Sequence, residues 1–518
     1  LFITEKGDTE PVKRHPEFRL FACMNPPTDI GKKNLPPAMR NRFTEFYVNE
    51  LTDADDLKIV VSKYLEKHQI ANPPTDAIVN FYLEAKAQSE AHLSDGAGHK
   101  PHYSLRTLSR SLEYVSVVLP IYGLERALYE GFCMGFLTLL SRSSFTVMEE
   151  IIRKHLCKKS RESLTSVPRC PGEGYVQFEH FWLRTGKFPV QDDRYFIITP
   201  SVQTHLKNLA RALKTNKYPI LLQGPTSAGK TSMVSYLAKR TGHRFVRINN
   251  HESTDLQEYF GTYITNSEGK LVFQEGILVE AVRNGYWIVL DELNLAPSDI
   301  LEALNRLLDD NRELFIPETQ EIIKPHPHFQ LFATQNPPGI YGGRKVLSRA
   351  FRNRFLEFHV DDIPGEELKT ILQRRCGISA RLSDRMVNVM RTLQTHRQSS
   401  KLFAGKGGFI TPRDLFRWAE RVTTLNNAYK EKQEIAEEGF MLLAERLRRD
   451  DEKTLVKETI EKSMAVTLDV DKMYDCEESE EFKSIELTGH SKIVWTKTMR
   501  RLFTLVGKSL KYKEPVLL

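Results

Sequence analysis

The strongest constraint on the fold of this chain is an internal repeat at an interval of about 300 residues. The matching segments occur in the same order along the chain. They are HPEFRLFACMNPP (residues 15–27) with HPHFQLFATQNPP (326–338), MRNRFTEFYVNEL (39–51) with FRNRFLEFHVDDI (351–363), and KYPILL (217–222) with KEPVLL (513–518). Solenoid repeats are far shorter, so a unit of this length indicates a tandem array of whole domains. We therefore expect the chain to be cut from a longer array of modules.

The complete module in the middle of the chain alternates short apolar runs with segments of helical spacing. The apolar runs, which we interpret as buried strands, cover residues 219–223, 244–249, 286–292, 329–336 and 354–360. This alternation predicts a parallel five-stranded sheet within a three-layer α/β core. Residues 262–273 and 313–326 contain turn residues between short apolar runs and are predicted to form two β-hairpins.

The repeat also predicts the division of the chain into segments. Residues 1–50 correspond to the C-terminal part of a first core, and residues 51–155 to its helical lid. The remaining predicted segments are a linker (156–195), the complete core (196–362), its helical lid (363–450), a charged linker (451–490) and the first helix and strand of the next core (491–518).

Composition and charge argue against several classes of function. The net charge of +7 is too small an excess to indicate nucleic-acid binding, and we expect no sequence-specific contact with nucleic acid. The longest apolar run, residues 131–140, is about half of a membrane span, so we expect no membrane association. The six cysteines form no CxxC pair, which argues against zinc and dithiol sites.

A glycine-rich segment follows the first predicted strand and opens a helix. It matches the phosphate-loop pattern GxxxxGK[ST], in which backbone N–H groups at a helix N-terminus point at phosphate oxygens. Lys230 would reach the β- and γ-phosphates of a nucleotide, and the Thr231 hydroxyl would ligate Mg²⁺. The predicted binding segment consists of Gly224, Pro225, Thr226, Ser227, Ala228, Gly229, Lys230, Thr231 and Ser232.

Three polar residues end predicted strands of the same core. Asp291 and Glu292 close the run WIVLDE, and a parallel sheet places that strand end beside the phosphate loop. Asp291 would hold Mg²⁺ through water, and Glu292 would orient the attacking water. Asn336 ends the fourth strand and could bond the γ-phosphate or the water; its counterpart in the first copy is Asn25. Without the loop, these residues would be read as solvated acids and an ordinary Asn-Pro turn.

Arginines at two places could complete a nucleotide site. Arg352 and Arg354 precede the fifth strand, where a guanidinium could act as an arginine finger. Arg413 begins a helix of the lid and could sense the γ-phosphate, and Arg106 is its counterpart in the first copy. The alternatives are surface arginines that bind carboxylates and, for Arg413, an ion pair between domains.

The phosphate loop, LDE, the strand-ending Asn, the paired arginines and the lid arginine occur in the order found in AAA+ ATPases. The two predicted hairpins resemble those of the helix-2-insert branch of that superfamily. The tandem repetition and the segment DLQEYFGTYITNSEGKLVFQEGILVEAVRNGYWIVLDELNLAPSDILEALNRLLDDNRELFIPET are similar to the midasin family of giant ring ATPases. The resemblance covers essentially the whole chain. It places the chain at the end of the second, all of the third and the start of the fourth AAA+ module.

The resemblance implies an ATPase that uses ATP and Mg²⁺, lies in the nucleus and releases assembly factors from pre-60S ribosomal particles. It also implies that neighbouring modules of the same chain share each nucleotide site. Arg354 would then serve the preceding module, and the site of Lys230 would need an arginine from the following one, so we expect slow hydrolysis by this chain alone. Two alternatives stay open: a structural segment that holds nucleotide without turnover, and a dynein-like motor ring.

Overall fold

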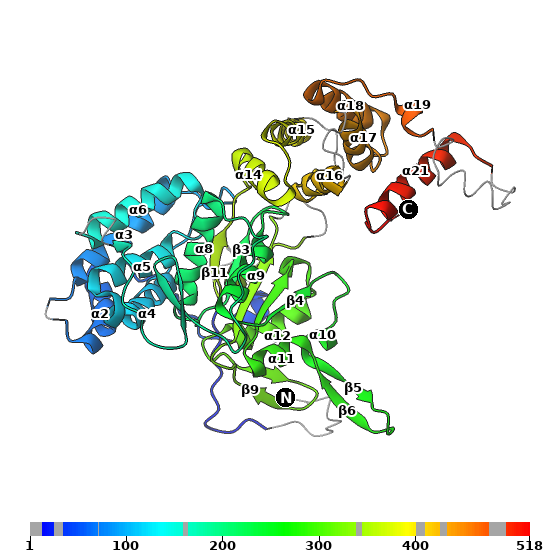
Figure 1. The fold of residues 1–518 in the computed structure, drawn as a ribbon. Helices are drawn as coiled ribbons and strands as arrows, with labels where there is room; N and C mark the ends of the chain where they lie inside the picture. The colour runs from blue at the N-terminus through cyan, green and yellow to red at the C-terminus, as the bar shows by residue number, and fades with distance from the viewer. Residues whose placement is uncertain are drawn as a thin grey trace.

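The computed structural model describes residues 13–24, 35–70, 72–158, 164–337, 344–399, 410–424, 432–475 and 494–517. A central α/β core lies between two helical lids, one at its N-terminal and one at its C-terminal side (Figure 1). Within the described residues, no helix is long and apolar enough to cross a membrane.

Five parallel strands form the sheet of the central core. They are β3 (Ile220–Gln223), β4 (Phe245–Asn249), β7 (Trp287–Asp291), β10 (Gln330–Gln335) and β11 (Leu356–His359). Their order across the sheet is β11-β3-β10-β7-β4, with every pairing parallel. Strands β3, β7 and β10 are buried along their whole length, which explains their continuous apolar sequences. The predicted parallel five-stranded sheet is confirmed.

Helices cover both faces of this sheet. Side chains alternate along a strand, so Leu222 and Val289 belong to one apolar cluster while Leu221 and Leu290 belong to another. The first cluster includes side chains of α8 (Pro200–Leu213) and α9 (Lys230–Thr241); the second includes those of α11 (Ile277–Asn284) and α12 (Ser298–Leu308). Two apolar faces under two helical layers give the predicted three-layer core.

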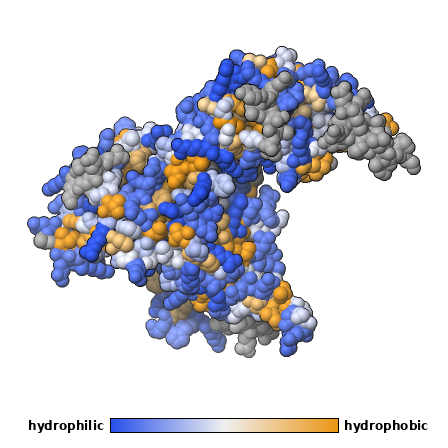
Figure 2. Space-filling model, in the orientation of Figure 1, coloured by the Kyte–Doolittle hydropathy of each residue, from blue (hydrophilic) through white to orange (hydrophobic). Residues whose placement is uncertain are grey.

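Both predicted hairpins are present. Strands β5 (Gly261–Thr265) and β6 (Leu271–Glu275) form an antiparallel ribbon between α10 (Leu256–Phe260) and α11, and this ribbon projects from the core (Figure 1). Figure 2 shows apolar atoms on the projecting ribbon, where Leu271 is among the exposed side chains. Strands β8 (Leu314–Ile316) and β9 (Glu321–Ile323) form the second hairpin.

The first lid packs tightly against the central core. Its helices are α2 (Ala54–Leu65), α3 (Thr75–Ala91), α4 (Leu105–Tyr122), α5 (Leu124–Phe136) and α6 (Arg142–Leu156). Lid and core share one continuous apolar cluster. The backbone of Thr138 accepts a 2.8 Å hydrogen bond from His359 of β11, and its hydroxyl donates to Glu357 O at 2.8 Å.

The segment expected to be a linker after this lid contains regular structure. Strands β1 (Tyr175–Phe178) and β2 (Phe181–Arg184) pair as an antiparallel hairpin. Phe181 is fully buried in the cluster that joins lid and core. The two short runs YVQF and FWLR are apolar enough to form the strands of a hairpin, but the polar residues around them suggest an extended connection.

The second lid has an apolar core of its own. Its helices are α14 (Gly365–Cys376), α15 (Ala380–Ser399), α16 (Pro412–Thr424), α17 (Lys432–Leu443) and α18 (Asp450–Met464). Helix α18 lies in the segment predicted as a charged linker. Its Val456, Ile460 and Met464 recur every four residues and are buried in the lid, while charged and hydroxyl residues occupy most other positions of the helix. The lid therefore extends beyond the predicted end at residue 450.

The two incomplete modules contain less regular structure than their sequences predict. In the described part of residues 13–50, the only element is the short helix α1 (Pro37–Arg40). At the other end, α21 (Lys497–Lys511) is the expected helix, but residues 515–517 form no strand. A strand needs a paired neighbour, and the described residues provide no partner strand for either segment.

Candidate functional site

The glycine-rich segment joins the end of β3 to the start of α9 as a curled loop. Ser227 and Gly229 have φ angles of 63° and 84°, in the left-handed region that turns the chain sharply. A Cβ on Gly224 would lie 2.2 Å from the carbonyl oxygen of Val360, so only glycine fits there. The loop thus brings its backbone close to β11 and directs the N-terminus of α9 toward the cleft.

Lys230 lies at the centre of the site. Its Nζ donates to the carbonyl oxygens of Gly224 and Pro225, each at 2.7 Å, and to Asn336 Oδ1 at 2.9 Å. The side chain is buried, and burial lowers its pKa to about 8, against the opposing effect of Asp291 and Glu292. Anionic phosphate would offer this ammonium a stronger partner than neutral carbonyl groups do.

Asp291 ends β7 beside the first turn of α9. Its Oδ2 accepts a 3.3 Å hydrogen bond from the Thr231 hydroxyl, and its other oxygen accepts one from Thr334. Asp291 also pairs with Arg247 of β4. A carboxylate and a hydroxyl at this distance are the hard oxygen ligands that Mg²⁺ prefers, so the two residues fit a metal held with nucleotide and water.

Glu292 follows Asp291 and turns away from the strand with a φ of 52°. Its backbone N–H donates to the Thr334 hydroxyl at 3.0 Å. Its carboxylate accepts from Asn336 Nδ2 at 3.3 Å and pairs with Arg344 at 3.0 Å. The left-handed turn therefore places Glu292 on the rim of the cleft and holds its carboxylate between two donors.

A cleft of about 970 Å³ separates the loop from the second lid. The core side of the cleft includes the loop, Asp291, Glu292 and Asn336, and Arg413 and Arg417 of α16 are among the residues on the lid side. A neighbouring cavity of about 410 Å³ adds apolar side chains, among them Ile197, Val202, Met233, Ile363 and Ile371. A polar cleft with basic groups next to an apolar cavity suits a molecule with a phosphate chain and a flat base.

Arg352 and Arg354 do not line this cleft. Arg352 pairs with Glu357 at 3.3 Å, and Arg354 Nε bonds Asp309 at 2.6 Å. Arg354 lines a separate pocket of about 290 Å³, together with Arg106 of the first lid. The structure thus divides the predicted site residues into two groups, as expected if Arg354 belongs to another module's site. Asn25 lies outside the described residues.

Sequence reasoning missed two charged neighbours of the strand-end acids. Arg247 interrupts the apolar run RFVRIN, and a charge inside an otherwise apolar strand is the available signal. Its proximity to Asp291 follows only from the pairing of β4 with β7. Arg344 comes from the segment after β10, and nothing in the local sequence connects it with Glu292.

The strand order, the loop between β3 and α9, and the acid pair at the end of β7 define an AAA+ ATPase module. A family model described as "AAA domain (dynein-related subfamily)" matches residues 219–355. Two others, each described as "Midasin AAA lid domain", match residues 56–159 and 367–467. The chain belongs to the midasin family.

Curated relatives agree with this assignment. Midasin of Dictyostelium discoideum is 55% identical over 543 aligned residues, and Midasin of Giardia intestinalis is 36% identical over 577. Each alignment covers 100% of this chain, which spans 9% and 12% of those relatives' lengths. An uncharacterized Staphylococcus aureus protein is 34% identical over 172 residues, which cover 32% of this chain and 65% of that protein.

Proposed function

We propose that the central module binds Mg·ATP in the cleft around Lys230 and hydrolyses it. The observation that carries this proposal is the convergence of Lys230, Asp291, Glu292 and Asn336 on one cleft from separate strand ends and the loop. Lys230 would bind the β- and γ-phosphates, and Thr231 and Asp291 would hold Mg²⁺, which supplies charge neutralisation and orients the phosphates. Arg413 would approach the γ-phosphate from the lid.

In the proposed reaction, Glu292 orients and polarises the attacking water. The carboxylate must first exchange at least one of its present donors, Arg344 or Asn336, for that water. Asn336 contacts both Lys230 and Glu292, so it is placed to report phosphate binding to the catalytic carboxylate. This gives Asn336 a positioning role between the loop and the acid.

We further propose that each site is completed by the following module. The pocket that contains Arg354 and Arg106 would then be part of the preceding module's site, because Arg106 repeats Arg413 and Arg354 is supplied by the next core. For the same reason no arginine finger reaches the cleft at Lys230 from the residues that the structure describes. Loss of such a finger slows hydrolysis by about 10³–10⁵.

For the whole protein we propose the role implied by its family. A ring of such modules would use ATP-driven lid movements to release assembly factors from pre-60S particles in the nucleus. The assignment to the midasin family supports this proposal. Fluorescent tagging of the full-length protein should give a nuclear signal, and arrest at the ATP-bound state should leave assembly factors on isolated particles. A purely cytoplasmic signal would contradict the location.

A structural role without turnover is the second candidate. The carboxylate of Glu292 is engaged by two donors, which favours a state that holds nucleotide without activating water. Calorimetry with Mg·ATP should detect binding by this chain and its loss in Lys230→Ala. In a protein that includes the following module, Glu292→Gln should lower turnover at least about 10²-fold while binding is retained. Unchanged turnover would favour the structural role.

A further inference from the structure

Helix α16 connects the nucleotide cleft with the first helix of the following core. Arg413 lies in its first turn, and Arg421 lies eight residues later, about 12 Å along the helix axis. Arg421 is buried and forms a bidentate pair with Glu514, with Nε–Oε1 at 3.0 Å and Nη2–Oε2 at 2.5 Å. Glu514 follows α21, the first helix of the incomplete module that comes after the central one. One lid helix thus contacts both the cleft and the next core.

A buried carboxylate of α17 strengthens this contact. Glu438 is 2% exposed and pairs with Arg421 at 3.3 Å. It also accepts bonds from Lys508 Nζ at 2.6 Å, in the last turn of α21, and from the hydroxyl of Tyr512, the C-cap of that helix, at 3.2 Å. Buried charges of this kind are strongly destabilising when one partner is removed, so the cluster fixes α21 relative to the lid.

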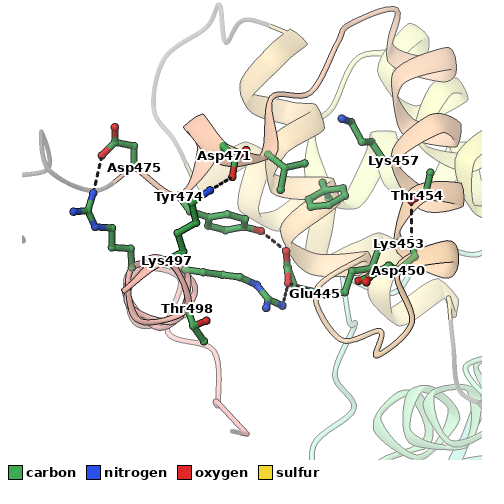
Figure 3. A pocket seen from close by; sticks show the side chains of 14 residues that line it. Glu445, Asp450, Lys453, Thr454, Lys457, Asp471, Tyr474, Asp475, Lys497 and Thr498 are labelled. Atoms are coloured by element: carbon green, nitrogen blue, oxygen red, sulfur yellow. Dashed lines mark hydrogen bonds and ion pairs between the residues drawn. The ribbon is translucent and has the colours of Figure 1, made fainter. Parts of the chain in front are cut away.

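Toward its other end, α21 has one ion pair with a partly exposed partner and one that is fully exposed. Figure 3 shows the Tyr474 side chain pointing toward Glu445, which accepts a 2.5 Å bond from the Tyr474 hydroxyl and pairs with Arg501 of α21. A cavity of about 490 Å³ lies beside these residues. Lys497 and Asp471 pair at 3.4 Å with both side chains about nine-tenths exposed. The anchor is therefore the Glu438 end of the helix.

In the first lid, helix α4 makes the corresponding contacts with the central core, but through side chains of different charge. Helix α4 starts one residue before Arg106, the counterpart of Arg413, and its Glu113 pairs with Lys217 at 2.5 Å and accepts a bond from the Tyr218 hydroxyl. These two residues join α8 to β3, the strand that leads into the phosphate loop. The repeat counterpart of Glu438 is Glu130, which is fully buried and pairs with Arg211 of α8 at 2.5 Å.

Each of the two buried glutamates begins a triplet EGF, at residues 130–132 and 438–440, and the structure explains why a glycine follows it. A Cβ on Gly439 would lie 2.4 Å from the Trp418 ring of α16, and a Cβ on Gly131 would lie 2.8 Å from Val115 of α4. Glycine therefore permits the close helix contact that brings each glutamate to the joint. The two lids conserve this geometry while the partner charges differ.

We infer that the helix that begins at the cleft arginine of each lid couples nucleotide binding to the position of the next module's first helix. Arg421 and Glu438 are the positioning residues of this joint in the second lid. The coupling rests on the proposed nucleotide site, whereas the anchor is independent of it. In the first lid the same path ends at the strand before the phosphate loop, so occupancy of one site would bias the next loop in the ring.

Hydrogen exchange of α21 without nucleotide tests the anchor. Arg421→Met and Glu438→Gln should each speed local opening of α21 by about tenfold or more, because each leaves a buried charge or polar group without its partner. Lys497→Met on the same helix is the matched control and should change opening by less than about threefold, since its ion pair is exposed. Helix α18 serves as the internal reference. If exchange in α18 also becomes faster in a variant, that variant has disturbed the whole lid, and Glu514→Gln is measured in its place. Unchanged exchange in α21 would overturn the anchor.

Adding Mg·ATP tests the coupling. Nucleotide should slow exchange in α21 of the parent chain but not in Arg421→Met, provided that calorimetry shows that this variant still binds Mg·ATP. Slowing of equal size in both proteins would overturn the coupling while the anchor stands. Absence of binding in the parent chain would contradict the proposed function and with it the coupling, and the nucleotide-free exchange would still decide the anchor.

Discussion

The cleft around Lys230 lies at the carboxyl ends of the strands of the central sheet, and the pocket around Arg354 lies at their amino ends. Asp291 is the last residue of β7 and Lys230 follows the carboxyl end of β3, whereas Arg354 precedes the amino end of β11. The cleft has a phosphate loop and acids, and within the described part of the chain no arginine of a neighbouring module lines it. The pocket has Arg354 and Arg106 but no phosphate loop. Each region therefore resembles one half of a nucleotide site. In a ring whose sites lie between modules, each module would carry the loop half of one site and the arginine half of another.

The largest expected effect concerns turnover. This chain alone should hydrolyse ATP about 10³-fold or more slowly than a protein extended by the following module, because the cleft would then gain the missing arginine. Single-turnover assays with matched nucleotide occupancy measure this ratio. Rapid hydrolysis by the chain alone would show that the cleft is already complete, and the comparison of two half-sites would fail.

A smaller effect is expected in nucleotide binding, where the two regions should respond differently. Lys230→Ala should weaken Mg·ATP binding by about 10–100-fold, because it removes charged hydrogen bonds to phosphate. Arg354→Ala, the matched variant in the other pocket, should leave binding at the cleft unchanged. Calorimetry on both variants provides the measurement. Equal losses would mean that Arg354 acts on the cleft of its own module.

The central core was predictable because its signals are local. The run from Trp287 to Asp291 is continuous and apolar. The phosphate-loop pattern before Lys230 requires a strand before the loop and a helix after it. The first copy shows the limit of such signals. Phe21 and Phe46 repeat Phe332 and Phe358, yet they are 87% and 82% exposed whereas their counterparts are 0% and 3% exposed. The same residues form a strand only where neighbouring strands exist to pair with them.

Contacts between distant segments were not predictable from sequence. Arg247 reaches Asp291 only because β4 lies beside β7, and the joint of Arg421 with Glu514 connects two modules. The charged sequence of α18 also concealed a buried stripe of residues. In each case the deciding information is the partner, and a local pattern does not contain it.

The lid arginine should have a moderate effect. Arg413→Ala should weaken ATP binding about tenfold, or ~1.4 kcal/mol, and ADP binding much less, if its guanidinium contacts the γ-phosphate. Arg106→Ala is the matched control, because Arg106 is the repeat counterpart but lines the other pocket. Competition binding measures the affinities of both variants for ATP and for ADP. An equal loss for both nucleotides would assign Arg413 to a part of the nucleotide that ATP and ADP share.

The smallest effect is the pH dependence of binding. Burial lowers the pKa of Lys230 to about 8, and bound phosphate would raise it again because it stabilises the ammonium. Binding should therefore take up a proton above pH 8, and the affinity for Mg·ATP should fall by at most about tenfold per pH unit there. Below about pH 7 the lysine is already protonated, so the affinity should not depend on its titration. Calorimetry at pH 8.5 in buffers of different ionisation enthalpy counts the protons directly. Arg354→Ala is the control, because a change in the other pocket should leave the proton count unchanged. A count of zero in the parent chain would mean that Lys230 does not contact the phosphates.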